Sequence, residues 1–163
     1  MNLNIQPSTF GRAEMFQPDV MVEDEKWYPL GKMGMVRPML FDVTNGGWIS
    51  ILKAVGEGTI QRHHHASPVQ AWTLDGAWGY REYDWVARAG SFVYEAAGGV
   101  HTLYIDPAAG KMTAIFHVHG PLVYLDEQGN AVDYDDVFLR LDRYAKHCRE
   151  VGLGDDYVKS LIR

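Results

Sequence analysis

The sequence has one cysteine, Cys148, in 163 residues, so the chain cannot form a disulfide within itself. No apolar run approaches the ~18 residues that a membrane span requires. The first residues also lack the basic and apolar regions of a signal peptide. The net charge is −6, and the basic residues form no block of the kind that binds nucleic-acid phosphates. These absences predict a cytoplasmic protein that binds neither membrane nor nucleic acid.

The composition is that of a folded protein, with 47% hydrophobic and 12% aromatic residues, and the length suits a single domain. We expect that domain to span residues 1–163, with an N-terminal arm at 1–26, a barrel at 27–133 and a helical tail at 134–163. The barrel section alternates glycine turns, one of them at 75–76, with short segments rich in Val, Ile, Tyr, Trp and Phe. The predicted strands are 35–43, 48–55, 58–66, 69–76, 78–86, 90–96, 101–106, 112–118 and 122–134. Their even spacing favours an all-β barrel or sandwich over βαβ units.

The last part of the chain has the periodicity of a helix rather than of a strand. Within "DDVFLRLDRYAKHCREVGL" the apolar residues recur every three or four positions, and Gly152 is a suitable stop. The apolar positions are Val137, Leu141, Tyr144, Cys148 and Val151. A second short helix is expected in "DDYVKSLIR". We predict that this tail packs on the barrel or on a second subunit, with Cys148 as an ordinary packing residue.

The segment "RHHHASPVQAW" holds three of the seven histidines. On a strand, His63 and His65 point to the same face and His64 to the other, so His63 and His65 can reach one metal ion. The candidates for a third ligand are His101, His117, His119 and His147. His101 is favoured because "GSFVYEAAGGVH" places a glycine turn directly before it, which permits close approach to a neighbouring strand.

These features resemble the two motifs of the cupin superfamily. The first motif is matched by Gly58, His63, His65, Gln70 and Gly76, and the second by Gly90, Ala96, Gly98 and His101. Gln70 stands where the family has a glutamate ligand, Ala96 replaces a proline, and Ile105 replaces an asparagine. The resemblance implies an all-β cupin barrel (a double-stranded β-helix, or jelly roll) with a C-terminal helical tail. It also implies a metal ion held by His63, His65 and His101.

A narrower resemblance rests on "REYDWVARAGSFVYEAAGGVHTLY" and "FHVHGPLVYLDEQGNAVDY", which are similar to the 2,4'-dihydroxyacetophenone dioxygenases. It implies a non-haem Fe(II) enzyme of aromatic catabolism that uses O2 to cleave a C–C bond of an aryl α-hydroxyketone into two carboxylic acids. Two alternatives stay open. One is a zinc-binding cupin module with a sensor role and no turnover, as in the anti-sigma-factor cupins, and the other is an oxygenase that cleaves β-diketones.

Roles follow for the remaining polar residues and for part of the aromatic set. With Gln70 in place of a carboxylate, the ion keeps its full charge and favours an anionic ligand. We expect Glu82 and His117 to act as base or proton relay, and Gln70, Glu95 and His119 to hydrogen-bond around the ligands. The sequence leaves open which of Glu82, His117 and His119 face the interior. Trp72, Tyr80 and Tyr94 are expected to line a substrate pocket, and the protein is expected to be a homo-oligomer, a dimer or larger.

Overall fold

The computed structural model describes residue 8, residues 11–32 and residues 34–163. In that part of the chain, eleven strands are followed by two helices. The strands are β1 (Tyr28–Leu30), β2 (Gly34–Asp42), β3 (Gly47–Val55), β4 (Thr59–His65), β5 (Val69–Tyr80), β6 (Val86–Arg88), β7 (Phe92–Glu95), β8 (Val100–Ile105), β9 (Lys111–Val118), β10 (Leu122–Leu125) and β11 (Ala131–Asp135). The helices are α1 (Val137–Glu150) and α2 (Gly154–Ser160). Residues 11–26 of the predicted arm form turns, bends and irregular backbone, and its residues 1–7 and 9–10 lie outside the described residues.

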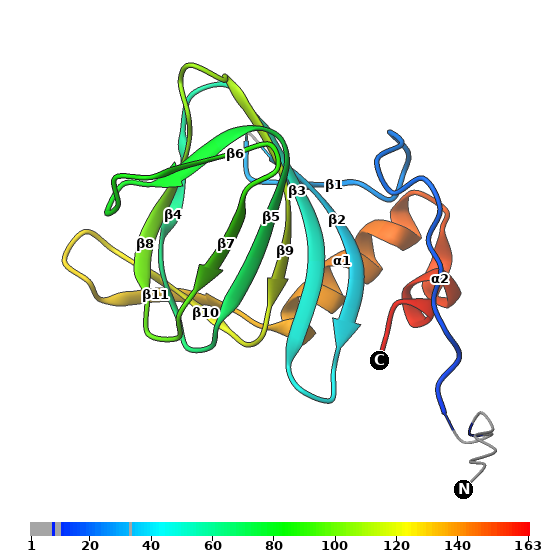
Figure 1. Cartoon of the computed structure of the whole chain (residues 1–163). Coiled ribbons are helices and arrows are strands. Elements are labelled where there is room, and N and C mark those ends of the chain that lie inside the picture. The colour runs from blue at the N-terminus through cyan, green and yellow to red at the C-terminus, as the bar shows by residue number, and fades with distance from the viewer. Residues whose placement is uncertain (1–7, 9–10, 33) are drawn as a thin grey trace, which may run out of the picture.

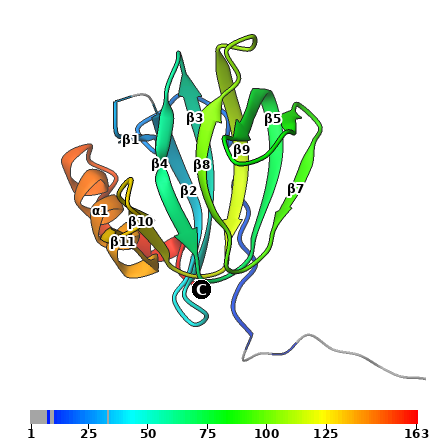
Figure 2. The same ribbon diagram turned by 90° about the vertical axis from the view of Figure 1, so that its left-hand side faces the viewer.

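The strands form one antiparallel sheet that curls into a barrel, in the order β1-β2-β3-β9-β5-β8-β4-β10-β11, with β6 and β7 added beside β5 (Figure 1). Strand β5 makes the curvature, because its first part pairs with β9 and its last part with β8. Turned by 90°, the barrel shows β4 and β8 in front of β2, β3 and β9 of the opposite wall (Figure 2). The predicted all-β barrel with a helical C-terminal part is therefore confirmed.

The turn predicted at 75–76 is absent, because β5 continues through these two residues. The strand has a bulge between Thr73 and Asp75, after which Gly76 has a φ of +67°. A Cβ at Gly76 would lie 2.0 Å from the backbone oxygen of Lys111, so this position needs glycine. The bulge bends the strand from one wall of the barrel to the other, whereas a hairpin would have reversed it. The predicted strand 78–86 is interrupted instead, since β5 ends at Tyr80 and β6 begins at Val86.

The helical tail packs on the barrel of its own chain. Helix α1 begins at Val137, where the carboxylate of Asp136 accepts a hydrogen bond from the backbone N–H of Leu139 at 2.8 Å. Tyr144 is buried against the rings of Tyr28 and Phe41. After α2, the backbone N–H of Phe41 donates to the oxygen of Leu161 at 2.9 Å, and this fixes the chain end to β2. Among the described residues, no helix combines the length and apolar character needed to cross a membrane.

The predicted apolar stripe of α1 is confirmed for Val137, Tyr144 and Cys148, which are buried. Val151 differs, because it lies just beyond the helix as its C-cap and is 38% exposed. A residue that the stripe did not predict, Arg140, is buried with them. The side chain of Arg140 lines a cavity inside the barrel.

Candidate metal centre

Three histidines from two neighbouring strands meet inside the barrel. His63 and His65 alternate with His64 along β4, and His63 lies directly opposite His101 on β8. The glycine turn before His101 fixes this register, because the N–H of Gly98 donates to the oxygen of His65 at 2.8 Å, and the N–H of His65 donates to Gly99 at 2.9 Å. Gly98 has a φ of +90°, which suits glycine. The predicted set of His63, His65 and His101 is thus brought together.

The spacing of the three imidazoles matches the geometry of a metal site. One ring nitrogen from each histidine lies within 4.8 Å of the other two, and all three side chains are buried. The Nε2 atoms of His65 and His101 are 3.0 Å apart. Two ligand atoms at right angles around a metal, each at ~2.1 Å, would be separated by about 3.0 Å.

The protonation states also suit metal binding. Nδ1 of His63 donates to the backbone oxygen of Gln61 at 2.8 Å, which leaves the lone pair of Nε2 free. Burial, together with the nearby His63 and His101, lowers the pKa of His65 to about 3. Burial likewise lowers the pKa of His63. Both rings are therefore neutral at pH 7 and able to coordinate a cation.

A buried carboxylate borders the three histidines. Oε1 of Glu95 accepts a hydrogen bond from the hydroxyl of Tyr80 at 2.7 Å, and the Tyr80 ring stacks on His101 with centroids 3.6 Å apart. Oε2 of Glu95 lies 3.1 Å from Nδ1 of His65 and 3.4 Å from Nε2 of His101. Burial and the neighbouring Glu95 raise the pKa of Tyr80 well above its usual value, so its hydroxyl stays a donor. Glu95 was predicted to hydrogen-bond around the ligands, and the structure places it there.

Buried polar atoms without partners show that the site suits a cation. Nδ1 of His65, Nδ1 of His101 and Oε2 of Glu95 are buried and make no hydrogen bond. Such atoms are costly to bury unless something pairs with them. Three imidazoles beside a carboxylate form a donor set that Fe, Zn, Cu or Ni ions accept. His63, His65 and His101 therefore fit a transition-metal ion, with Glu95 at its edge.

Gln70 does not reach this site, which corrects the expectation that it stands beside the metal. It lies on the outer face of the barrel, where its Oε1 accepts from Nε2 of His119 at 3.2 Å. The residue that faces inward is Val69, which is buried, lines the cavity and pairs with Glu95 in the β5–β7 register. Strand alternation is the reason, because a shift of one residue exchanges the two faces. The acidic residue of β5, Asp75, is exposed and pairs with Lys111, so the carboxylate beside the histidines comes from Glu95 on β7.

His117 and His119 are also on the outer face, so the predicted catalytic role of His117 is not supported by its position. Their rings lie 3.9 Å apart, and Gln70 pairs with His117 across β5 and β9. The neighbours of His117 on β9, Phe116 and Val118, line the interior instead. Partial burial and the neighbouring His119 lower the pKa of His117.

Glu82, the other predicted catalytic residue, lies in the exposed turn after β5. Its carboxylate accepts from the backbone N–H of Thr102 at 2.8 Å and from the Thr102 hydroxyl at 3.0 Å. Burial acts to raise the pKa of Glu82, but the hydrogen bonds from Thr102 outweigh it and the pKa is lowered. Since Thr102 and His101 point to opposite faces of β8, Glu82 braces the outer side of the strand that carries His101.

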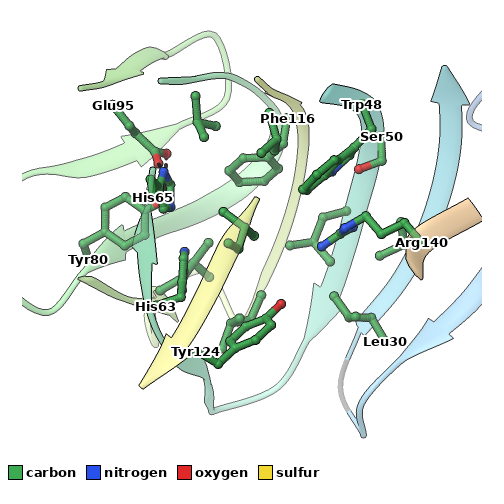
Figure 3. A pocket seen from close by; sticks show the side chains of 17 residues that line it. Leu30, Trp48, Ser50, His63, His65, Tyr80, Glu95, Phe116, Tyr124 and Arg140 are labelled. Atoms are coloured by element: carbon green, nitrogen blue, oxygen red, sulfur yellow. Dashed lines mark hydrogen bonds and ion pairs between the residues drawn. The ribbon is translucent and has the colours of Figure 1, made fainter. Parts of the chain in front are cut away.

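An apolar cavity of about 70 Å³ lies against the histidines. Figure 3 shows His63, His65, Tyr80 and Glu95 at one side of it and Arg140 pointing in from the opposite side. The cavity shares Leu30, Ile60 and Tyr124 with an outer hollow of about 350 Å³. The interior is thus a narrow inner chamber with a wider mouth.

Of the three aromatic residues predicted to line a pocket, Tyr80 does so. Trp72 is 41% exposed and packs on Phe92 outside the barrel, because its neighbours Ala71 and Thr73 take the inward positions. Tyr94 is 59% exposed and lines a separate surface groove that also touches Glu95 and His101. Trp72 and Tyr94 therefore do not line the inner cavity, and their role at a substrate pocket stays a prediction.

Several residues of the cavity escaped the sequence analysis, above all Trp48, Tyr124 and Arg140. A signal for Arg140 exists, since it follows Val137 by three positions and so falls on the apolar stripe of the helix. A charged residue on a buried stripe indicates a specific partner.

With this geometry in place, comparison with known proteins identifies the family. The model described as "ChrR Cupin-like domain" matches residues 18–123. The chain belongs to this cupin family. Among proteins with curated descriptions, none matches it.

Solved structures agree with this ChrR-like cupin assignment. An RmlC-like cupin protein of Ralstonia eutropha JMP134 is 36% identical, with a TM-score of 0.74 over 77% of this chain and 83% of that one. An acetylacetone dioxygenase of Acinetobacter johnsonii is 15% identical, with a TM-score of 0.71 over 86% of this chain and 99% of that one. A Rhodobacter sphaeroides structure of SigE in complex with the anti-sigma ChrR is 16% identical, with a TM-score of 0.50 over 60% and 51%. The last two show a shared fold.

Proposed function

We propose that this ChrR-like cupin is a non-haem Fe(II) dioxygenase that uses O2 to cleave a C–C bond of an enolisable ketone. The observation that carries the proposal is the trio of buried histidines at the end of an apolar cavity. His63, His65 and His101 would hold the ion. Bound iron would supply a site where an enolate and O2 meet, together with Lewis acidity that favours the enolate.

The protein residues supply the base and the environment. Glu95 is the base in this proposal, since one of its oxygens is held by Tyr80 while the other lies beside the rings of His65 and His101, where the metal ion would bind. It can take the proton that a ketone loses when it enolises. The apolar walls formed by residues such as Leu52, Phe116 and Val118 keep water from the reacting carbon.

For the substrate, an aryl α-hydroxyketone such as 2,4'-dihydroxyacetophenone would place its ketone head in the inner chamber. Its ring would lie in the outer hollow, beside Leu30, Ile60 and Tyr124. The inner chamber alone is smaller than the ~150 Å³ that holds a benzene molecule in other proteins. This size favours a second candidate, a compact β-diketone, and the fold is shared with an acetylacetone dioxygenase.

A zinc-binding module without turnover is the alternative class, and the family model carries the name of ChrR, which a solved structure describes as an anti-sigma protein. The two classes differ in their need for a base and a chamber beside the metal, and the described residues have both in Glu95 and the apolar cavity. We therefore favour the enzyme. A homo-oligomeric state and a cytoplasmic location stay predictions.

The test is O2 consumption by untagged protein reconstituted anaerobically with Fe(II) or Zn(II). We expect uptake with 2,4'-dihydroxyacetophenone or acetylacetone in the iron form, stoichiometric with ketone consumed, and none in the zinc form. The metal found in protein as purified is measured in parallel. If the protein as purified contains zinc, and its iron form consumes no O2 with either ketone, the enzyme proposal is rejected in favour of the zinc module.

A further inference from the structure

Arg140 carries a buried cation into the chamber from a helix outside the barrel. It is only 9% exposed and lines the cavity together with His63, His65 and Tyr124. Its guanidinium lies over the Trp48 ring, 4.4 Å from the ring centre. Figure 3 shows this group pointing from α1 toward the side where the histidines lie. A cation in an apolar chamber is costly unless it has a partner.

The polar neighbours of Arg140, Asp135 and the side chain of Tyr124, account for only part of the guanidinium group. Nη2 of Arg140 is 2.8 Å from Oδ2 of Asp135. Nε of Arg140 is buried and has no hydrogen-bond partner. Oδ1 of the same Asp135 is 3.0 Å from Nη1 of Arg143, whose side chain is 50% exposed. One carboxylate is therefore shared between two guanidinium groups, and this group of three retains a net positive charge.

The two sides of the chamber thus differ in chemistry. One side has three buried imidazoles and the Glu95 carboxylate, which suit a metal ion and the enolisable part of a ligand. The other side has a partly compensated guanidinium with an unused N–H donor. Carboxylates are the usual partners of arginine, because the planar fork of donors matches their two oxygens.

We propose that Arg140 selects a ligand that bears a carboxylate, so that the ketone substrate is a compact oxo acid. The inference rests on the proposed function for the reacting end of the ligand and on Arg140 for the other end. The carboxylate faces Arg140, and the enolisable ketone faces His63, His65 and Glu95. The small volume of the chamber limits the spacer between the two groups to a few atoms.

Two ligands that differ mainly by a carboxylate test this. Pentane-2,4-dione and 2,4-dioxopentanoate share the β-diketone, and only the second is an acid at its end. We measure the affinity of each by calorimetry, under anaerobic conditions, with Zn(II)-loaded protein. Since a charge-assisted hydrogen bond is involved, we expect the wild type to bind the acid about 10–100-fold more tightly than the dione.

The variants Arg140→Gln and Arg140→Lys separate this role from anchoring the helix. We expect Arg140→Gln to remove the preference for the acid while changing the affinity for the dione less than about 3-fold. Arg143→Gln is the matched comparison, because Arg143 binds the same Asp135 from outside the cavity. It should leave the affinity for the dione unchanged and lower the affinity for the acid less than Arg140→Gln does, since Arg140 remains in the cavity. If Arg140→Gln does not fold, Arg140→Lys gives the same comparison, since it keeps a charge and loses the Nε donor. Its preference should fall and the dione affinity should stay.

Three results would overturn the inference: no preference for the acid in the wild type, no binding of either ligand, or equal losses for both ligands in the Arg140 variants. Failure of the oxygenase proposal is distinguishable. In that case the acid preference persists but no O2 is consumed with any ketone or oxo acid. Conversely, if the protein consumes O2 with neutral ketones but shows no preference for the acid, the oxygenase proposal stands and the proposed role of Arg140 is rejected.

Discussion

The two faces of the barrel sheet carry the same residue types with opposite consequences. Six of the seven histidines lie on β4, β8 and the β9 region, and strand alternation divides them equally. His63, His65 and His101 converge inside, where burial lowers the pKa of His63 and His65. His64, His117 and His119 face outward and are only partly buried. A histidine in this fold is therefore a ligand candidate because of its face, not because of its neighbours in the sequence.

The carboxylates of Glu95 and Glu82 differ between the inner and outer faces in the same way. Glu95 is buried beside His65 and His101, whereas Glu82 is exposed and holds Thr102 on the outer side. Each pair of inner and outer residues is a matched experiment, since the same substitution can be made on both faces. The following variants use such pairs, from the largest expected effect to the smallest.

Glu95→Gln should abolish most of the activity, and Glu82→Gln should not. Removal of a general base lowers a rate by about 10²–10⁴-fold. Glu82 contacts only Thr102 among the residues near the histidines, so its variant should stay within about 2-fold of the wild type, as most surface changes do. The measurement is the rate of O2 uptake at equal iron content. Comparable losses in both variants would remove the distinction between the two carboxylates.

Val69→Glu should destabilise the metal-free protein, and Gln70→Glu should not. Val69 is buried opposite Glu95, so a new carboxylate there is buried beside a like charge, at a cost of about 3–5 kcal/mol. Gln70 faces outward, and its variant should change the free energy of unfolding by under ~0.5 kcal/mol. Urea denaturation measures both, and added Zn(II) should stabilise Val69→Glu more than it stabilises the wild type or Gln70→Glu. A larger gain from Zn(II) in Gln70→Glu than in Val69→Glu would mean that the two residues exchange faces.

Tyr80→Phe should lower the free energy of unfolding by less than Val69→Glu does, and Tyr94→Phe should hardly change it. The first change leaves Oε1 of Glu95 without its donor, and an unsatisfied buried acceptor costs about 1–3 kcal/mol. Tyr94 is exposed and should tolerate loss of its hydroxyl within ~0.5 kcal/mol. The check is again the free energy of unfolding of metal-free protein. Equal values for the two tyrosines would argue against a buried Tyr80–Glu95 hydrogen bond.

The sequence was sufficient for the fold and for the three histidines. Regular strand-length segments predict the barrel, and the glycine turn before His101 identifies the third ligand, because Gly98 and Gly99 hydrogen-bond His65. Gln70 could not be placed, since the motif allows three or four residues after His65 and a single residue changes the face. The bulge in β5 was read as a turn, because Gly76 suits both.

Long-range contacts account for what was missed. Arg140 enters the chamber from a helix that follows the barrel, so no pattern within the strands points to it. Glu82 and Glu95 both flank the second motif, and only the pairing of β7 with β5 decides that Glu95 is the inner one.

The most direct test of this account is the metal content of two triple variants. His63→Ala/His65→Ala/His101→Ala removes the inner histidines, and His64→Ala/His117→Ala/His119→Ala removes the outer ones. After identical purification and loading with Fe(II) or Zn(II), elemental analysis should find close to no metal in the inner variant. The outer variant should retain as much metal as the wild type. Equal metal content in the two variants would contradict the assignment of the metal centre to the inner face.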